Sequence, residues 1–473
     1  VFKKGDLTLN CENGIQYVLD DLAILYDSIH ATQNERKMTC DTIKFFSNDN
    51  ILHGIGNSHV WDIDYNLVAD SITIFTEIDS GIAAGNVTLI QKGQIINSDR
   101  IKYKREKGKK GVSYTAIGNV IIKDSSIIAK CGKATYSHLD RNTTLDINPQ
   151  INESERILSG ERIFLSYENE KLKELHIPQK ANVITIAKGY QKSVTDSMKL
   201  GDSLSLKNKI EGKKLVSFFN NGKIDSIRIE GMAKTLYHVF KDSIYQGNNN
   251  VSGDTITMSF LDNELNTINI LGGSEGEYFP DSVTNKIKLP VIYKANKIQY
   301  QLMNNESDLF GNVSINHDGT NLDAGFVNVN WQNNMLEALG RAKEDTISNL
   351  FHPIISEDSR EPMTGKTMMY NLKTRKGRIT QGQTKADDGF YSGKKIRNES
   401  ERVFLIENST YTTCDLDTSH FHFQSKMMKI IQNDVVIARP IILHLGQIPV
   451  FGLPFGIFPH KGGQRHSGWI MPG

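Results

Sequence analysis

A degenerate repeat of about 30 residues constrains the fold of this chain more than any other feature. A typical copy begins Asp70-Ser71-Ile72-Thr73-Ile74, where apolar and polar residues alternate, and later reaches the pair Gly85-Asn86. The same Gly-Asn pair begins at residues 56, 85 and 118. Alternation with a period of two predicts a strand with one buried face. Because one such unit cannot bury that face alone, neighbouring units are expected to stack.

The Gly-Asn pairs are predicted to be tight turns between strands, because both residues tolerate a positive φ angle. Further copies of the repeat are recognisable at residues 253–258 and 296–300. Frequent Ile, Val, Thr, Asn and Gly favour strands and turns over helices throughout the chain. The first forty residues fit no copy of the repeat, and a short helix is expected at residues 20–30.

Charge and hydropathy exclude several classes of protein. The chain carries 55 Lys and Arg against 54 Asp and Glu, so it lacks the basic excess that a nucleic-acid partner requires. It contains no run of about 18 apolar residues, and therefore no candidate transmembrane helix. The start at Val1 shows no charged-then-apolar signal, so we expect a processed or trimmed chain whose signal peptide has been removed.

Motifs for catalysis are absent from the sequence. It contains no G-x-S-x-G elbow, no H-E-x-x-H pair and no Walker loop, so neither an enzyme nor a cofactor is expected. His420 and His422 have a spacing that can bind a metal, but surface histidines on strands are the simpler interpretation. The four cysteines are too dispersed for a zinc site. An even count permits disulfides, but the sequence does not give the pairing, and a bond between Cys11 and Cys40 is a guess.

The last hundred residues carry several pieces in a fixed order. Tyr411-Thr412-Thr413-Cys414-Asp415 is followed by Ile448-Pro449-Val450-Phe451-Gly452-Leu453-Pro454-Phe455 and then by Arg465-His466-Ser467-Gly468-Trp469. This order resembles the soluble N-terminal part of the LptD (OstA) family of outer-membrane lipopolysaccharide-assembly proteins. The earlier units resemble the OstA-type repeat that LptA, LptC and LptD share, at lower specificity.

The resemblance implies an all-β fold, an elongated, twisted, open β-jellyroll (a β-taco) of stacked OstA-like repeats. One jellyroll and two consecutive jellyrolls both remain open. Four segments are expected. Residues 1–40 have no assigned fold, 41–348 hold the OstA/LptA-like repeats, 362–447 hold the LptD-type terminal strands, and 448–473 connect to an outer-membrane β-barrel that is absent from this chain.

The inward side chains of the repeats have two interpretations. They can fill an ordinary core, or they can line a groove that holds acyl chains. The second follows from the resemblance, and each CH₂ group shielded from water stabilises a bound lipid by about 0.8 kcal/mol. The candidate groove residues are Ile43, Phe45, Ile72, Ile74, Val87, Leu89, Ile101, Tyr103, Val120, Ile122, Ile298, Tyr300 and Val313.

The proline- and aromatic-rich tail also has two interpretations, a segment that hands lipid to the barrel or a hydrophobic linker packed on the last strand. The candidate handover residues are Ile448, Pro449, Phe451, Pro454, Phe455 and Phe458. The basic residues that could meet lipid phosphates or headgroups are His460, Lys461, Arg465 and His466. Cys414 matches a family cysteine that joins an interdomain disulfide to the barrel, so its partner would lie outside this chain.

The function that the resemblance implies is conduction of lipid in the periplasm, at the outer membrane of a Gram-negative bacterium. The domain would shield the acyl chains of lipid A and pass lipopolysaccharide from an LptA-like bridge to the barrel, beside an LptE-like lipoprotein. Two alternatives remain open: a secreted β-solenoid adhesin with a filled core, and a glycan-binding or glycan-cleaving β-helix.

Overall fold

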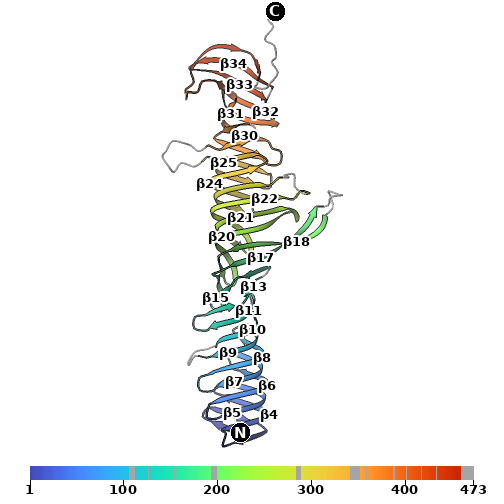
Figure 1. Ribbon diagram of the computed structural model, residues 1–473, viewed down its shortest axis with the longest axis vertical. Coiled ribbons are helices and arrows are strands. Elements are labelled where there is room, and N and C mark those ends of the chain that lie inside the picture. The colour runs from blue at the N-terminus through green and yellow to red at the C-terminus, as the bar shows by residue number, and fades with distance from the viewer. Residues whose placement is uncertain are drawn as a thin grey trace, which may run out of the picture. The chain divides into compact units, whose positions relative to one another are not determined.

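Every element of the computed structural model in the residues it describes is a β-strand (Figure 1). These residues are 1–105, 112–125, 127–153, 155–192, 200–283, 289–340, 352–357, 360–386, 389–400, 402–416, 418–432 and 434–459. The all-β prediction is therefore confirmed, and the antiparallel strands form long twisted sheets. No long apolar helix of the kind that crosses a membrane occurs in the described part of the chain.

The helix expected at residues 20–30 is wrong, because strand β4 occupies Leu22–Gln33. Ala23, Leu25, Ile29 and Ala31 are buried while the residues between them face outward. Except for a bulge in the middle, this is the period of a strand and not of a helix. The first forty residues therefore belong to the same sheet as the repeats that follow.

The chain divides into two compact units, which are described separately. Unit 1 contains residues 1–187, 205–234 and 257–264, and unit 2 contains residues 188–204, 235–256 and 265–473. Strands β17, β18, β20 and β21 contribute residues to both, and β22 contributes its first residue, Glu264, to unit 1. The predicted limits at 40/41 and 348/362 fall inside units 1 and 2, respectively, so the four-segment division stays a prediction.

The strands of unit 1, including those that it shares with unit 2, are β1 (Phe2–Lys4), β2 (Leu7–Asn10), β3 (Asn13–Tyr17), β4 (Leu22–Gln33), β5 (Arg36–Phe46), β6 (Ile51–Trp61), β7 (Tyr65–Phe75), β8 (Ser80–Gln91), β9 (Gln94–Lys104), β10 (Ser113–Lys123), β11 (Ile128–Ser137), β12 (Asn142–Asp146), β13 (Gln150–Glu153), β14 (Arg156–Ser159), β15 (Arg162–Glu168), β16 (Lys171–Ile177), β17 (Ala181–Lys192), β18 (Leu200–Gly212), β19 (Lys214–Asn220), β20 (Lys223–Lys241) and β21 (Ile244–Leu261).

The strands of unit 2 that follow are β22 (Glu264–Pro280), β23 (Val291–Gln301), β24 (Glu306–His317), β25 (Thr320–Asn330), β26 (Met335–Leu339), β27 (Ile354–Glu357), β28 (Arg360–Thr364), β29 (Thr367–Asn371), β30 (Gly377–Ala386), β31 (Gly389–Ser400), β32 (Val403–Thr412), β33 (Phe421–Ile431), β34 (Val435–Leu445), β35 (Ile448–Leu453) and β36 (Gly456–Pro459).

The Gly-Asn pairs are β-bulges inside strands, so their prediction as turns is wrong. Gly85 and Asn86 lie in the middle of β8, where the register shifts between Ala84 and Val87. Both residues have positive φ angles, 78° and 46°. The pairs at residues 56, 118 and 311 make the same shift in β6, β10 and β24. Positive φ suits bulges as well as tight turns, which is why the sequence misled the prediction.

The aspartate of each repeat supports the bulge of the next strand. Asn86 Nδ2 donates a hydrogen bond to Asp70 Oδ2 at 3.0 Å, and Asn57 donates to Asp41 at 3.1 Å. A Cβ atom at Gly85 would overlap with the Asp70 carboxylate. The repeat is therefore a structural unit in which Asp, Gly and Asn together bend the sheet.

The line of bulges divides the sheet of unit 1 into two halves. Half A contains residues 80–84 of β8 and 100–104 of β9, and half B contains residues 87–91 of β8 and 94–98 of β9. After β11 each long strand is replaced by two shorter ones. β11 pairs with β12 in half A and with β13 in half B. In Figure 1, β4 to β11 follow one another in chain order along this unit.

The turns between strands lie at the outer ends of the two halves. The A tips, at the end of half A, are residues 47–50, 76–79, 138–141 and 169–170, and the B tips are residues 34–35, 62–64 and 92–93. Backbone hydrogen bonds connect successive A tips, for example from Thr76 N to Asn50 O at 3.0 Å. Because bulges bend the strands that carry them, the two halves fold toward each other with their apolar faces inside.

Candidate functional site

The inward face of half B carries an unbroken row of apolar side chains. In it each residue is the direct cross-strand partner of the next, so the row runs perpendicular to the strands. At about 4.8 Å per strand it is roughly 40 Å long. This row B consists of Met38, Val60, Leu67, Leu89, Ile96, Ile122, Ala129, Ile151, Leu158 and Val183, all buried.

A second row on the inward face of half A mixes large and small residues. Gly54 stands between Ile43 and Ile72, and Ala83 stands between Ile72 and Ile101. The small positions remove side-chain volume from the inside of the folded sheet. This row A consists of Ile43, Gly54, Ile72, Ala83, Ile101, Ala116, Ala134, Leu145 and Ile163, all buried.

Unit 2 contains a comparable row of its own. It begins at Ile270 of β22 and ends at Ala438 of β34, with a direct cross-strand partner at each step. This row C consists of Ile270, Ile298, Leu309, Val327, Ala338, Met368, Ile379, Ile396, Ile406, Met428 and Ala438, all buried.

The predicted groove residues all lie inside the folded sheets. Twelve of them are buried, and only Tyr300 is half-buried. Its hydroxyl lies 2.7 Å from that of Tyr293, and Asn249 donates to it at 3.2 Å. The sequence analysis missed the small residues of row A, because Gly54 and Ala83 carry no apolar signal of their own. Whether any of these residues contacts lipid stays a prediction.

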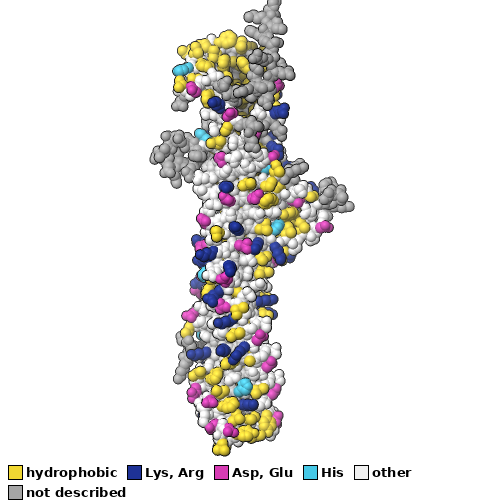
Figure 2. All heavy atoms as spheres, in the orientation of Figure 1, with side chains coloured by type: hydrophobic (Ala, Val, Ile, Leu, Met, Phe, Trp, Pro, Cys, Tyr) yellow, Lys and Arg dark blue, Asp and Glu magenta, His cyan; other side chains and the backbone are white. Residues whose placement is uncertain are grey.

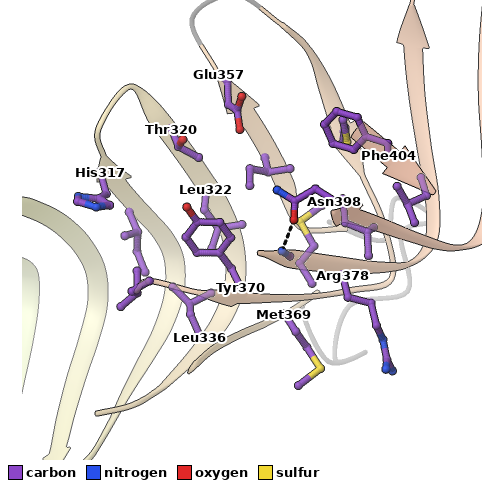
Figure 3. Close-up of a pocket in the computed structure, with 18 of the residues that line it drawn as sticks. His317, Thr320, Leu322, Leu336, Glu357, Met369, Tyr370, Arg378, Asn398 and Phe404 are labelled. Carbon is purple, nitrogen blue, oxygen red and sulfur yellow. Dashed lines mark hydrogen bonds between the residues drawn. The ribbon is translucent and has the colours of Figure 1, made fainter. Parts of the chain in front are cut away.

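A cavity of about 80 Å³ lies in unit 2 beside row C (Figure 3). Leu322, Leu336 and Phe404 contribute apolar surface, and His317 and Glu357 lie at its edge. Asn398 accepts a hydrogen bond from the backbone N–H of Gly377 at 2.6 Å. Ligand pockets usually measure about 300–1,000 Å³, so the sheet must open further to admit an acyl chain here.

The handover candidates form an exposed apolar surface at the end of the described chain. β35 and β36 both pair with β34, β35 along its C-terminal half and β36 along its N-terminal half. Phe451 and Phe455 are 58% and 61% exposed, and Figure 2 shows hydrophobic side chains gathered over β34. The C-terminal apolar surface consists of Leu445, Ile448, Pro449, Val450, Phe451, Pro454, Phe455, Ile457 and Phe458.

Apolar surface of this extent marks an interaction site more often than a solvated face. The tail is thus paired to the last long strand, as the linker interpretation requires, and exposed, as the handover interpretation requires. The basic candidates His460, Lys461, Arg465 and His466 lie outside the described residues.

No metal site forms around the histidines within the residues that the structure describes. His422 stacks on His444 with ring centroids 4.8 Å apart. Burial and the nearby His444 lower the pKa of His422. His420 Nδ1 lies 4.0 Å from Cys414 Sγ. These contacts pack neighbouring strands together, and among the described residues they bring no third ligand for an ion.

All four cysteines are free thiols, so the expected bond between Cys11 and Cys40 is not formed. Burial raises the pKa of Cys40 to about 12 and that of Cys131 to about 11. Cys414, the predicted interdomain disulfide cysteine, is half-buried, as is Cys11.

We expect a maleimide reagent at pH 8 to modify Cys11 and Cys414 at least ~100-fold faster than Cys40 and Cys131, because the thiolate is the reactive form. Mass spectrometry of peptides over time measures the four rates. In urea the four rates should converge, and fast modification of Cys40 in folded protein would contradict the packing described for unit 1.

A comparison with known protein families addresses the middle of unit 1. Residues 66–171 match the family described as LptA/(LptD N-terminal domain) LPS transport protein. No curated protein matches the chain. The solved structure of LptH from Pseudomonas aeruginosa, described as the LptA homologous periplasmic component of the lipopolysaccharide transport device, aligns at 14% identity with a TM-score of 0.25. The alignment covers 32% of this chain and 93% of that one.

The family match covers the two apolar rows from β7 to β15, which include Leu89, Ile101 and Ile122. This segment of the chain is therefore similar to the LptA/LptD N-terminal type of lipopolysaccharide-transport protein.

Proposed function

We propose that this chain is a lipid conduit that carries lipopolysaccharide through the periplasm, with the acyl chains held between its sheet halves. The observation that carries the proposal is the continuity of the apolar rows. Rows A and B offer an acyl chain the same apolar surface at every strand, so a lipid can move along them without crossing a polar barrier. A filled core would align its buried residues in the same way, so the conduit also requires that the halves separate to admit an acyl chain.

The resemblance to LptD suggests a more specific role in lipopolysaccharide transport. The chain would receive lipopolysaccharide from an LptA-like bridge and pass it, by way of the C-terminal apolar surface, to a barrel assembled with an LptE-like lipoprotein. Cys414 would then pair with a cysteine of that barrel. The exposure of Phe451 and Phe455 supports this role, because both side chains lie at the last paired strands and lack a covering element among the described residues.

A second candidate, a structural β-solenoid with a filled core, is favoured by the tight burial of the same rows. Side chains such as Leu89 and Ile101 are 0% exposed, and the cavity beside row C holds about 80 Å³. The two functions differ in one physical property, which is whether the halves separate to admit an acyl chain.

Photo-crosslinking separates the two candidates. We expect benzoylphenylalanine at Phe45 or Tyr103, which are inward aromatic positions, to crosslink to purified lipopolysaccharide. The same residue at Lys44 or Lys102, which lie next to them and face outward, should not crosslink. Circular dichroism confirms that each variant is folded. Folded protein with no crosslink at either inward position would establish the filled solenoid.

A further inference from the structure

Ion pairs close the folded sheet of unit 1 where its A and B tips meet. Arg36, next to a B tip, forms an ion pair at 2.5 Å with Asp79 of an A tip. Arg105, at the end of β9 in half A, binds Asp62 of another B tip. Each pair joins residues far apart in the sequence, and each blocks the open side of the sheet at its own position.

The third contact of this kind is much looser. Lys92 of a B tip lies 3.7 Å from Glu170 of an A tip, and the two side chains are 34% and 63% exposed. At this point a polar cavity of about 370 Å³ opens between the tips. This mouth pocket is lined by Gln91, Lys92, Gln94, Tyr136, Arg141, Tyr167, Asn169 and Glu170.

The mouth pocket lies on the open side of the sheet, beside the middle part of both apolar rows of unit 1. Gln91 is two residues from Leu89 of row B, and Tyr136 is two residues from Ala134 of row A. Side chains two apart on a strand share a face. A ligand with acyl chains along the rows would therefore place its polar end in this pocket.

The side chains of the pocket suit a sugar that carries a phosphate. Burial raises the pKa of Tyr136, although Arg141 opposes this, and burial also raises the pKa of Tyr167. Both phenols therefore remain protonated and present aromatic surface with a hydroxyl donor. Amides bind sugar hydroxyls, and Arg and Lys bind phosphate through charge-assisted hydrogen bonds. Within the described residues, no ion-pair partner within 4 Å compensates the charge of Arg141.

We propose that the mouth pocket binds the phosphorylated sugar headgroup of the transported lipid, with Arg141 and Lys92 contacting the phosphate. The inference rests on the proposed function, since it names the headgroup that belongs to the acyl chains inside. The volume of the mouth pocket lies within the range of about 300–1,000 Å³ that is usual for small-ligand pockets. Glu170 competes with the phosphate for Lys92, so the pocket is held partly closed without ligand.

Two probes test the site in the full chain by equilibrium binding: lipid A in detergent micelles, and its deacylated phosphorylated disaccharide in water. Arg141→Gln is expected to weaken binding of lipid A about tenfold or more, because it removes a charged hydrogen bond. Glu170→Gln is expected to tighten it, since it frees Lys92. Lys130→Gln removes one exposed charge from the outward face of β11 and should leave the affinity unchanged.

A purely structural role for Arg141 would not predict opposite effects of the two substitutions. If the substitutions change the affinity for lipid A only, the site recognises the headgroup of a bound lipid. If the affinity for the disaccharide changes by the same factor, the pocket binds the disaccharide independently of the acyl chains. The proposal is overturned if neither substitution changes the binding of either probe. Inward crosslinks at Tyr103 that persist in that case would leave the conduit function standing without the pocket.

Discussion

Asp62→Asn is expected to destabilise unit 1 by about 1.5–3 kcal/mol, because it removes the charged hydrogen bond of Arg105. Among the described residues, only the carboxylates of Asp64 and Asp79, at 3.8 and 3.9 Å, then balance the guanidinium. The Asp62 side chain is 1% exposed and that of Arg105 is 21% exposed. Burial lowers the pKa of Arg105, but the hydrogen bond and charge of Asp62 outweigh this effect and raise it above its ordinary value. Arg105 stays charged in the variant as well, because a guanidinium does not lose its proton near neutral pH.

Asparagine tests the charge of Asp62 separately from the hydrogen bonds that its side chain accepts in the turn. Asp62 Oδ1 accepts hydrogen bonds from the backbone N–H groups of Asp64 and Tyr65, at 2.7 and 3.1 Å. Asparagine keeps an oxygen for these bonds, whereas alanine would lose them as well. Arg105→Gln removes the other charge, and the double variant should cost less than the two single changes added together.

Urea unfolding followed through tryptophan fluorescence measures these costs. Trp61 lies next to Asp62, and replacing Trp331 and Trp469 by phenylalanine in every variant makes it the reporter of unit 1. Lys173→Gln, which breaks an exposed pair with Glu168, is the matched control and should change little. A cost for Asp62→Asn no larger than that control would show that the tips are not held by this pair.

The strands and their buried faces could be predicted from alternation alone. Ile72 and Ile74 lie two apart in the sequence, and both side chains are buried. This pattern is local, so it can be read without knowing the fold. Strand β4 was not recognised from alternation, because Asp27 and Ser28 interrupt it. Both residues have positive φ and form a bulge that has no Gly-Asn pair.

The contacts at the open side of the sheet could not be predicted. Arg36 and Asp79 are 43 residues apart, as are Asp62 and Arg105. In the sequence, these four residues look like ordinary charged residues of a solvated surface. They meet only because the bulges fold the two halves together. The mouth pocket depends on the same folding, since its residues come from turns on both halves.

Gly85→Ala is expected to destabilise unit 1 by about 2–5 kcal/mol, from two separate causes. A residue with a Cβ atom pays roughly 1–2 kcal/mol for a left-handed conformation, and Gly85 has a φ of 78°. The new Cβ would also overlap with the carboxylate of Asp70, and such overpacking costs about 1–3 kcal/mol. The urea experiment on Trp61 measures the sum.

Gly93→Ala separates the two causes, because Gly93 has a φ of 77° and no atom within 4 Å of the position of a Cβ. It should show the backbone cost alone, and the excess at Gly85 is then the overlap with Asp70. Combining Gly85→Ala with Asp70→Ala should recover part of that excess, although Asn86 loses its acceptor. Equal costs at Gly85 and Gly93, with no recovery in the double variant, would mean that the aspartate does not support the bulge. The repeat would then determine only the alternation of buried and exposed residues in its strands. The bend that brings rows A and B face to face would need another cause.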